Sequence, residues 1–194
     1  MSYATKLKWF IAAVVLLAVG SRYGCYYLDQ QLDAKRRPWA YSSDQPLLVG
    51  RWVGECRDPD GIVHRVDMTI DEPLTDEERW KRANRKKRKR DRGSRTFFDG
   101  LALVETQGRL DTFELWGGLD APDGHQIHFQ WRPLEGKTHP PGFNLNAMKG
   151  DWQGDAIDLE VGFSWFRQDG SSFSDSADPR YSQKGQLLLK RAPL

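Results

Sequence analysis

Residues 47–57 constrain the fold most, because they read as one β-strand with a turn directly behind it. Along this segment small and aromatic side chains alternate with charged ones, the pattern of a strand with two unlike faces. Residues 58–61, Asp-Pro-Asp-Gly, have the composition of a tight turn. Gly50 and Gly54 share the face of Trp52, so we expect a neighbouring strand or a closing barrel wall to approach closely there.

The rest of the chain repeats this pattern in short alternating segments separated by turn residues. Eight such strands predict a mainly-β fold, an antiparallel meander that closes into a barrel or folds into a sandwich. An eight-stranded barrel has an interior that is either packed or holds one small ligand. Further strands are expected at 62–70, 96–105, 110–116, 125–133, 143–153, 156–166 and 181–191.

The first strand also carries a family resemblance. Gly50-Arg51-Trp52 resembles the Gly-x-Trp opening of lipocalin-like (calycin) barrels. In that family a basic residue of the last strand packs over the Trp ring and closes the barrel. The resemblance implies an eight-stranded antiparallel barrel closed by Gly50, Trp52 and Arg191, with Lys190 as the other candidate for the cation. A cation over an indole contributes about 0.5–2 kcal/mol.

A second, narrower resemblance concerns a barrel of this kind behind a membrane tether. Residues 50–54 and 185–191 are similar to the minimal β-barrel of bacterial membrane-anchored antiphage effectors, which senses a cyclic nucleotide. That family has two transmembrane helices, whereas this chain offers one candidate. The resemblance therefore implies a cyclic-nucleotide ligand more directly than it implies a membrane-disrupting output.

The N-terminal residues predict a single transmembrane helix. Residues 9–20 contain no charge, and extension to Leu28 gives twenty residues interrupted by Arg22. A spanning helix needs roughly 17 to 25 mostly apolar residues, and a long Arg side chain can reach the headgroups. Trp9 and three tyrosines would form the aromatic belts at the two interfaces. The tyrosines are Tyr23, Tyr26 and Tyr27.

This pattern divides the chain into an anchor at 1–28, a linker at 29–46 and a barrel at 47–194, and it predicts a single-pass protein of a bacterial inner membrane. Two alternatives stay open: a signal peptide cleaved before Ser21, and a lipoprotein modified at Cys25. Basic residues flank both ends of the apolar segment, so the side of the membrane that the barrel occupies also stays open.

A basic segment interrupts the barrel sequence. Residues 79–95 hold eleven basic side chains and one acidic one, which leaves 18 basic and 26 acidic residues elsewhere. Thr75 and Glu78 form a capping box, so we expect an inserted helix of about 18 residues within 74–95. With Trp80 and Ala83 as its apolar residues, this helix could not bury a face against the barrel.

Such charge asymmetry predicts an anionic partner: an anionic lipid, a glycan phosphate or a nucleotide or nucleic acid. A solvated loop without a specific partner is the competing interpretation. The candidate anion-binding residues are Arg79, Lys81, Arg82, Arg85, Lys86, Lys87, Arg88, Lys89, Arg90 and Arg92.

Aromatic residues in the later strands supply a candidate ligand pocket. Most aromatic residues on a pleated surface fill a core, but in an eight-stranded barrel they could also line a pocket for a flat or apolar ligand. The residues proposed for that pocket are Trp116, Phe129, Trp131, Trp152 and Trp165.

The sequence gives no sign of an active site. Two isolated cysteines fit neither a disulfide framework nor a zinc site, and His125 and His128 would point to opposite faces of a strand. Asp158 and Glu160 share a face, but alternation on an exposed strand explains them. Neither a nucleophile elbow nor a phosphate-binding loop is found. We therefore expect no enzymatic activity, no cofactor and no metal.

These observations predict a membrane-anchored, non-enzymatic β-barrel module that binds or senses a ligand, and a homo-oligomer is compatible with them. One alternative is a cyclic-nucleotide-sensing antiphage effector. The other is an envelope assembly protein that docks partners through its basic helix. A sensor predicts a polar and aromatic pocket inside the barrel, whereas an assembly protein predicts a filled barrel with an interface patch outside.

Overall fold

The computed structural model describes residues 3–43, 46–83, 95–135, 137–173, 180 and 183–193. The chain forms two units, and each is described by itself. One unit contains the helices α1 (Tyr3–Arg36) and α3 (Asp76–Ala83), and the other contains α2 (Pro38–Tyr41) and the strands.

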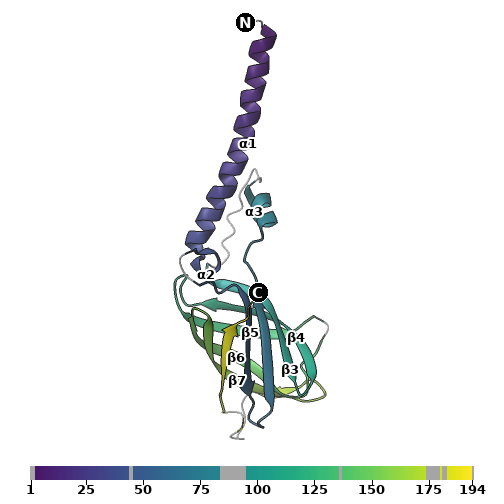
Figure 1. Cartoon of the computed structure of the whole chain (residues 1–194). Helices are drawn as coiled ribbons and strands as arrows, with labels where there is room; N and C mark the ends of the chain where they lie inside the picture. The colour runs from purple at the N-terminus through teal and green to yellow at the C-terminus, as the bar shows by residue number, and fades with distance from the viewer. Residues whose placement is uncertain are drawn as a thin grey trace. The chain divides into compact units, whose positions relative to one another are not determined.

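Within the described residues, the second unit is a closed antiparallel barrel of eight strands (Figure 1), which confirms the predicted fold class. Each strand pairs with its neighbours in the sequence, and the last barrel strand, β9, returns to pair with β1. A two-residue strand, β8 (Ser172–Phe173), pairs with the end of β7. The barrel strands are β1 (Gly50–Arg57), β2 (Val63–Ile70), β3 (Phe97–Thr106), β4 (Arg109–Leu119), β5 (Gln126–Pro133), β6 (Gly142–Gln153), β7 (Ala156–Phe166) and β9 (Gly185–Arg191).

The close approach expected beside Trp52 lies at the closure between β1 and β9. A Cβ atom added to Gly54 would lie 2.3 Å from the carbonyl oxygen of Leu188 on β9. Real Cβ atoms do not approach a backbone oxygen so closely, so a side chain at this position would push the two strands apart. Glycine here is therefore a requirement of closure.

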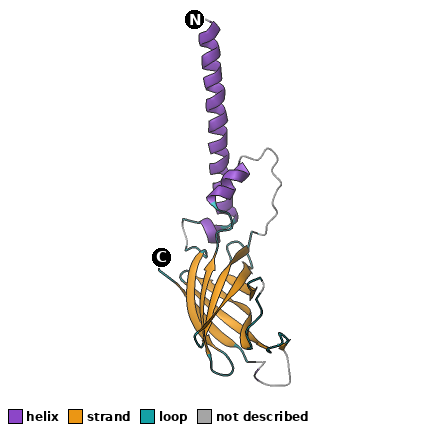
Figure 2. Ribbon diagram, turned by 90° about the vertical axis from the view of Figure 1, so that its right-hand side faces the viewer, coloured by secondary structure: helices purple, strands orange, loops and turns teal. Residues whose placement is uncertain are grey.

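The barrel interior is formed by the buried positions of each strand. Burial alternates with a period of two along β1, β2, β3 and β5, because successive side chains of a strand point to opposite sides of the wall. Figure 2 shows the strands wrapping around this interior. On β6 the register shifts between Leu145 and Met148, and both side chains are buried although they are three residues apart. A β-bulge allows this change of parity.

One end of the barrel is covered by α2, and we call it the capped end. Trp39 of α2 is fully buried, its ring centre lies 5.9 Å from that of Phe98, and its backbone oxygen accepts a hydrogen bond from Leu48. The predicted linker at 29–46 therefore contains a core element of the barrel. The opposite end carries the β1–β2 and β3–β4 turns, and we call it the hairpin end.

In the first unit, α1 is one continuous helix whose segment Lys6–Arg36 is long and apolar enough to cross a membrane. A signal sequence passes the same test of length and composition. The predicted capping box begins α3, because Thr75 N–H donates to Glu78 Oε2 at 3.1 Å and Glu78 N–H donates to Thr75 Oγ1 at 3.3 Å. The part of the expected basic helix from 84 to 94 lies outside the described residues.

Candidate docking groove on the outer wall

The capped end is held by Trp52 and Arg191. The guanidinium carbon of Arg191 lies 4.4 Å from the centre of the fully buried Trp52 ring. The indole Nε1–H donates to the carbonyl oxygen of Leu48 at 2.8 Å. Arg191 also donates from Nη1 to the Val49 carbonyl at 3.1 Å and from Nε to Asp155 Oδ1 at 2.7 Å. One side chain thereby joins the last strand, the segment before β1 and the β6–β7 turn.

Gly50 completes this cluster. Its φ angle is +129°, a backbone conformation that side chains disfavour, and an added Cβ would lie 3.0 Å from Arg191 Nη1. The structure thus brings together Gly50, Trp52 and Arg191, the three residues that the resemblance to lipocalin-like barrels implied for barrel closure.

The five residues proposed as a ligand pocket do not lie together. Phe129, Trp131 and Trp152 are buried in the interior, each at most 8% exposed, and Trp165 packs partly buried against the same core. Trp116 lies on the outer wall, because its position on β4 has the opposite parity to the buried positions. The pocket as predicted therefore needs correction: Trp116 belongs to a different surface from the other four.

Aromatic rings in the interior pack directly on one another. Phe98 contacts Phe129 with ring centres 5.3 Å apart, and Phe113 stacks on Trp131 at 5.4 Å. The Nε1–H of Trp131 donates to the carbonyl oxygen of Leu145 at 2.7 Å. These contacts are the packing of a core, in which the large side chains occupy the barrel lumen themselves.

His64 is buried and His139 is half-buried, and both contact neighbouring side chains. His64 contacts Asp58 Oδ2 through Nε2 at 3.1 Å and Thr106 Oγ1 through Nδ1 at 2.8 Å, which ties the β1–β2 turn to β3. His139 stacks on Phe166 with ring centres 3.9 Å apart, and burial lowers the pKa of its imidazole. Within the part of the chain that the structure describes, no group of three or more His, Cys, Asp or Glu side chains could hold a metal ion.

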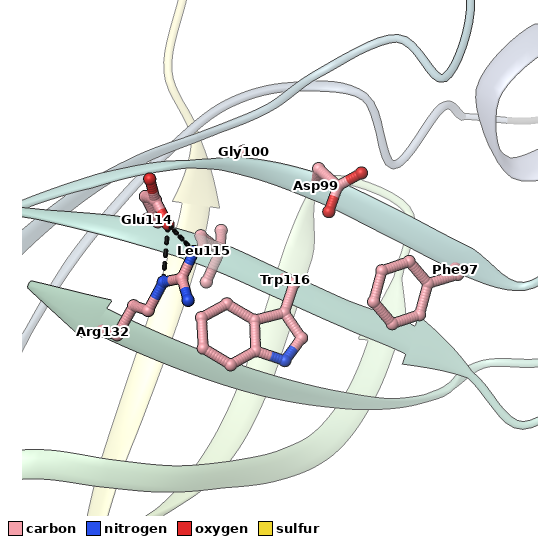
Figure 3. Close-up of a pocket in the computed structure, with 7 residues that line it drawn as sticks. All are labelled: Phe97, Asp99, Gly100, Glu114, Leu115, Trp116 and Arg132. Atoms are coloured by element: carbon pink, nitrogen blue, oxygen red, sulfur yellow. Dashed lines mark hydrogen bonds and ion pairs between the residues drawn. The ribbon is translucent and has the colours of Figure 1, made fainter. Parts of the chain in front are cut away.

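A hollow of about 340 Å³ lies on the outside of the barrel, over β3, β4 and β5 (Figure 3). Alternation places its polar and aromatic side chains on the outer wall, and cross-strand pairing sets their order, with Asp99 directly opposite Trp116. Phe97 borders the hollow with 43% of its surface exposed. The lining residues are Phe97, Asp99, Gly100, Glu114, Leu115, Trp116 and Arg132. We call this hollow the wall groove.

One side of the wall groove is lined by an ion pair whose opposite charges neutralise each other. Arg132 Nη2 lies 2.6 Å from Glu114 Oε2, and its guanidinium carbon lies 5.7 Å from the centre of the Trp116 ring. The Nε1–H of Trp116 donates to Gln130 Oε1 at 3.1 Å. These contacts hold the indole in place on the wall although it is not part of the core.

The other side of the wall groove is acidic. Asp71, at the end of β2, donates its backbone N–H to the carbonyl oxygen of Asp99 at 2.9 Å. Burial raises the pKa of the Asp71 carboxyl, and the nearby charge of Asp99 raises it further. Among the described residues no ion pair involves the Asp99 carboxylate. A negative potential therefore borders the exposed Phe97 ring and the half-buried Trp116 ring.

Sequence reasoning missed Phe97, Asp99, Glu114 and Arg132 as members of one surface. A usable signal was present, because Trp116 alternates with Leu115 and Gly117, so an inward Leu115 implies an outward Trp116. An aromatic residue on the solvent side of a strand is the kind of exception that marks a binding surface.

In the first unit, Trp80 of α3 packs on the tyrosines of α1. Its ring centre lies 5.4 Å from that of Tyr23 and 5.3 Å from that of Tyr26. The sequence indicated that this helix has no face to bury against the barrel; the structure gives Trp80 a different site, on α1. Lys81 pairs with Glu77 at 2.7 Å on the exposed surface of α3.

Most of the predicted anion-binding side chains lie outside the described part of the structure. Lys81 is exposed, and Arg79 and Arg82 lie in α3, with their side chains outside the described part of the structure. The remaining candidates, Arg85, Lys86, Lys87, Arg88, Lys89, Arg90 and Arg92, also lie outside the described residues.

Comparison with known proteins gives barrel folds but no family. No protein-family model matches the sequence, and no curated protein matches it. Among solved structures, the chain is similar to a fluorescence-activating β-barrel that was designed de novo, with a TM-score of 0.41. It is also similar to EF1p2_mFAP2b bound to DFHBI, with a TM-score of 0.43. In both cases the identity is 12%, over 75% of this chain and 94% of the other.

Proposed function

We propose that this protein is a membrane-anchored, non-enzymatic docking module, in which the barrel is a packed scaffold and the wall groove contacts a partner protein. One observation carries the proposal: the lumen is occupied by the protein's own side chains, whereas the exposed Phe97 and the half-buried Trp116 lie together on the outer wall. Trp39, Trp52, Phe98 and Phe129 are each at most 1% exposed, while Phe97 beside Trp116 is 43% exposed.

This contrast favours a docking module over a sensor with a ligand inside the barrel. A small-molecule site is a concave cavity that buries most of its ligand, and the interior rings here already bury one another. An aromatic pair on the outer wall beside charged residues is instead the composition of a protein interface, in which aromatic and Arg residues are enriched. A lipocalin-like closure remains compatible with this proposal, because the Arg191–Trp52 contact stabilises the scaffold whatever the barrel binds.

The first unit would supply the anchor. Its apolar helix is long enough to span a bilayer, and Tyr23 and Tyr26 would then lie at the interface, where aromatic rings are enriched. The packing of Trp80 against them supports a position of α3 at headgroup level. We therefore propose that the basic residues of 79–95 meet anionic headgroups, each contributing about 1 kcal/mol near the surface.

The docking proposal can be tested by site-specific crosslinking in native membranes. A photo-reactive amino acid replaces Phe97 in the groove or, as a control, Leu110, which is 60% exposed and does not line the groove. The expected result is one adduct of discrete mass from position 97 and none from position 110. Adding Trp116→Ala should abolish that adduct while leaving the melting temperature unchanged, because this ring lies outside the core.

Two results would contradict the proposal. One is an identical adduct pattern at positions 97 and 110, or no adduct at either position. The other is saturable binding of a cyclic dinucleotide to the full-length protein that Trp116→Ala leaves intact and Phe129→Leu abolishes. The latter result would place recognition inside the barrel and would favour the cyclic-nucleotide sensor.

A further inference from the structure

We propose that the wall groove recognises an arginine side chain in a basic segment of its partner protein, with the guanidinium between the Phe97 and Trp116 rings and beside the Asp99 carboxylate. This inference rests on the proposed docking function and adds the chemistry of the partner. Figure 3 shows Trp116 in the middle of the groove, with the Glu114–Arg132 pair on one side of its ring and Asp99 and Phe97 on the other.

Charge is the first argument for a cation. Three carboxyl groups, those of Asp71, Asp99 and Glu114, lie in or beside the groove, and among its described lining residues the guanidinium of Arg132 is the one cationic group. Arg132 is already bound to Glu114 at 2.6 Å, so that pair is neutral. On the other side, burial raises the pKa of Asp71 and the nearby charge of Asp99 raises it further. A cationic group placed there would relieve the repulsion between these two carboxylates.

The rings are the second argument, and they favour arginine over lysine. A guanidinium is planar, weakly hydrated and able to stack on an aromatic face while it donates to a carboxylate. Arg132 shows that the Trp116 ring accepts a guanidinium from one side, at 5.7 Å. Phe97 and Asp99 provide a ring and a carboxylate on the other side of the same hollow, which has room for a side chain at about 340 Å³.

The closed sheet is the third argument, because it determines how a partner can bind. Along the groove β4 is paired with β3 on one side and with β5 on the other, so its backbone N–H and C=O groups are already hydrogen-bonded to these strands. A partner therefore cannot add a strand at this place, as peptides do at an open sheet edge. Recognition must come from side chains, and an acidic aromatic hollow selects a basic one.

The test uses the full-length protein in non-ionic detergent micelles and a capped tri-arginine peptide as the probe. The readout is the indole N–H resonance of Trp116, which Trp116→Phe identifies by its loss. We expect a saturable shift of this resonance, weakened by added salt because the attraction is partly screened. The matching tri-citrulline peptide, which has the same shape without the charge, should produce no shift.

Substitution of one carboxylate locates the binding site. Asp99→Asn should weaken binding of the tri-arginine peptide about 2- to 5-fold, the range expected for an exposed charge pair. Asp158→Asn is the matched control, since Asp158 is an exposed carboxylate on β7 and does not line the groove. This substitution should leave the affinity unchanged.

The inference is wrong if tri-citrulline binds as well as tri-arginine, if Asp99→Asn and Asp158→Asn weaken binding equally, or if the Trp116 resonance does not move. The docking function has its own separate outcome. A crosslink from position 97 whose yield is undiminished in Asp99→Asn would keep the groove as an interface and assign it an uncharged partner. Loss of every position-specific crosslink would remove the docking function itself.

Discussion

Replacement of Trp52 by alanine tests how the barrel is closed. Trp52 is fully buried, donates a hydrogen bond to the Leu48 carbonyl and lies 4.4 Å from the Arg191 guanidinium. Large-to-small aromatic changes in cores cost about 3–5 kcal/mol. The lost cation–π contact, at about 0.5–2 kcal/mol, is part of that total. We expect Trp52→Ala to lie in the upper part of the range, because the Leu48 carbonyl also loses its donor.

A less drastic variant separates the contributions. Trp52→Phe keeps an aromatic ring in the core but removes the indole N–H, so it should cost about 1–2 kcal/mol, mainly for the lost hydrogen bond and the smaller ring. A double-mutant cycle with Arg191→Met should give a coupling energy of about 1 kcal/mol between the two side chains. The same cycle with Lys190 in place of Arg191 should give no coupling energy, because Lys190 is exposed on the same strand.

The assay is thermal unfolding of the full-length protein in micelles, followed by near-ultraviolet circular dichroism. For a domain of this size 1 kcal/mol corresponds to about 2–4 °C, so Trp52→Ala should lower the melting temperature by roughly 10 °C. A midpoint within one or two degrees of the unmodified protein would refute the reasoning. It would mean that Trp52 contributes nothing to the core and that closure depends on the remaining strand contacts.

Three further predictions concern other parts of the molecule. Asp58→Ala should destabilise the barrel by about 3 kcal/mol in urea unfolding, because it leaves buried His64 and two turn amides without their acceptor. An unchanged midpoint of the urea transition would contradict this prediction. Burial raises the pKa of the Cys56 thiol to about 12, so iodoacetamide should not label it in the folded protein below pH 10 and should label it in urea. Trp80→Ala should weaken binding of the full-length protein to anionic vesicles at low salt. If the variant binds as tightly as the unmodified protein, α3 does not lie at the membrane interface.

Local sequence pattern was enough to predict the strands. The barrel strands that it placed agree closely with those of the structure, because alternation and turn residues are local properties of the chain. The local pattern did not predict two features of the sheet. The β-bulge between Leu145 and Met148 depends on how β6 fits against β7, and β8 is a two-residue strand without a pattern of its own.

The candidate site was only partly predictable. Trp116 was chosen as an aromatic residue, but its side of the wall depends on which residues of β4 face the lumen, and it was grouped with interior residues. The groove also needs Asp99 opposite Trp116 and Arg132 beside Glu114. Cross-strand register brings these residues together, and register is a tertiary property.

By itself the sequence determined the mainly-β fold, the apolar N-terminal helix and the basic segment, because each follows from composition or from local periodicity, whereas the residues for closing the barrel came from the resemblance to lipocalin-like barrels. Only the tertiary structure decided that Trp39 fills the capped end, that Trp80 packs on Tyr23 and Tyr26, and that Phe97 and Trp116 lie together on the outer wall. These contacts join residues far apart in the chain. Their geometry depends on strand pairing and helix packing, which no short stretch of sequence encodes.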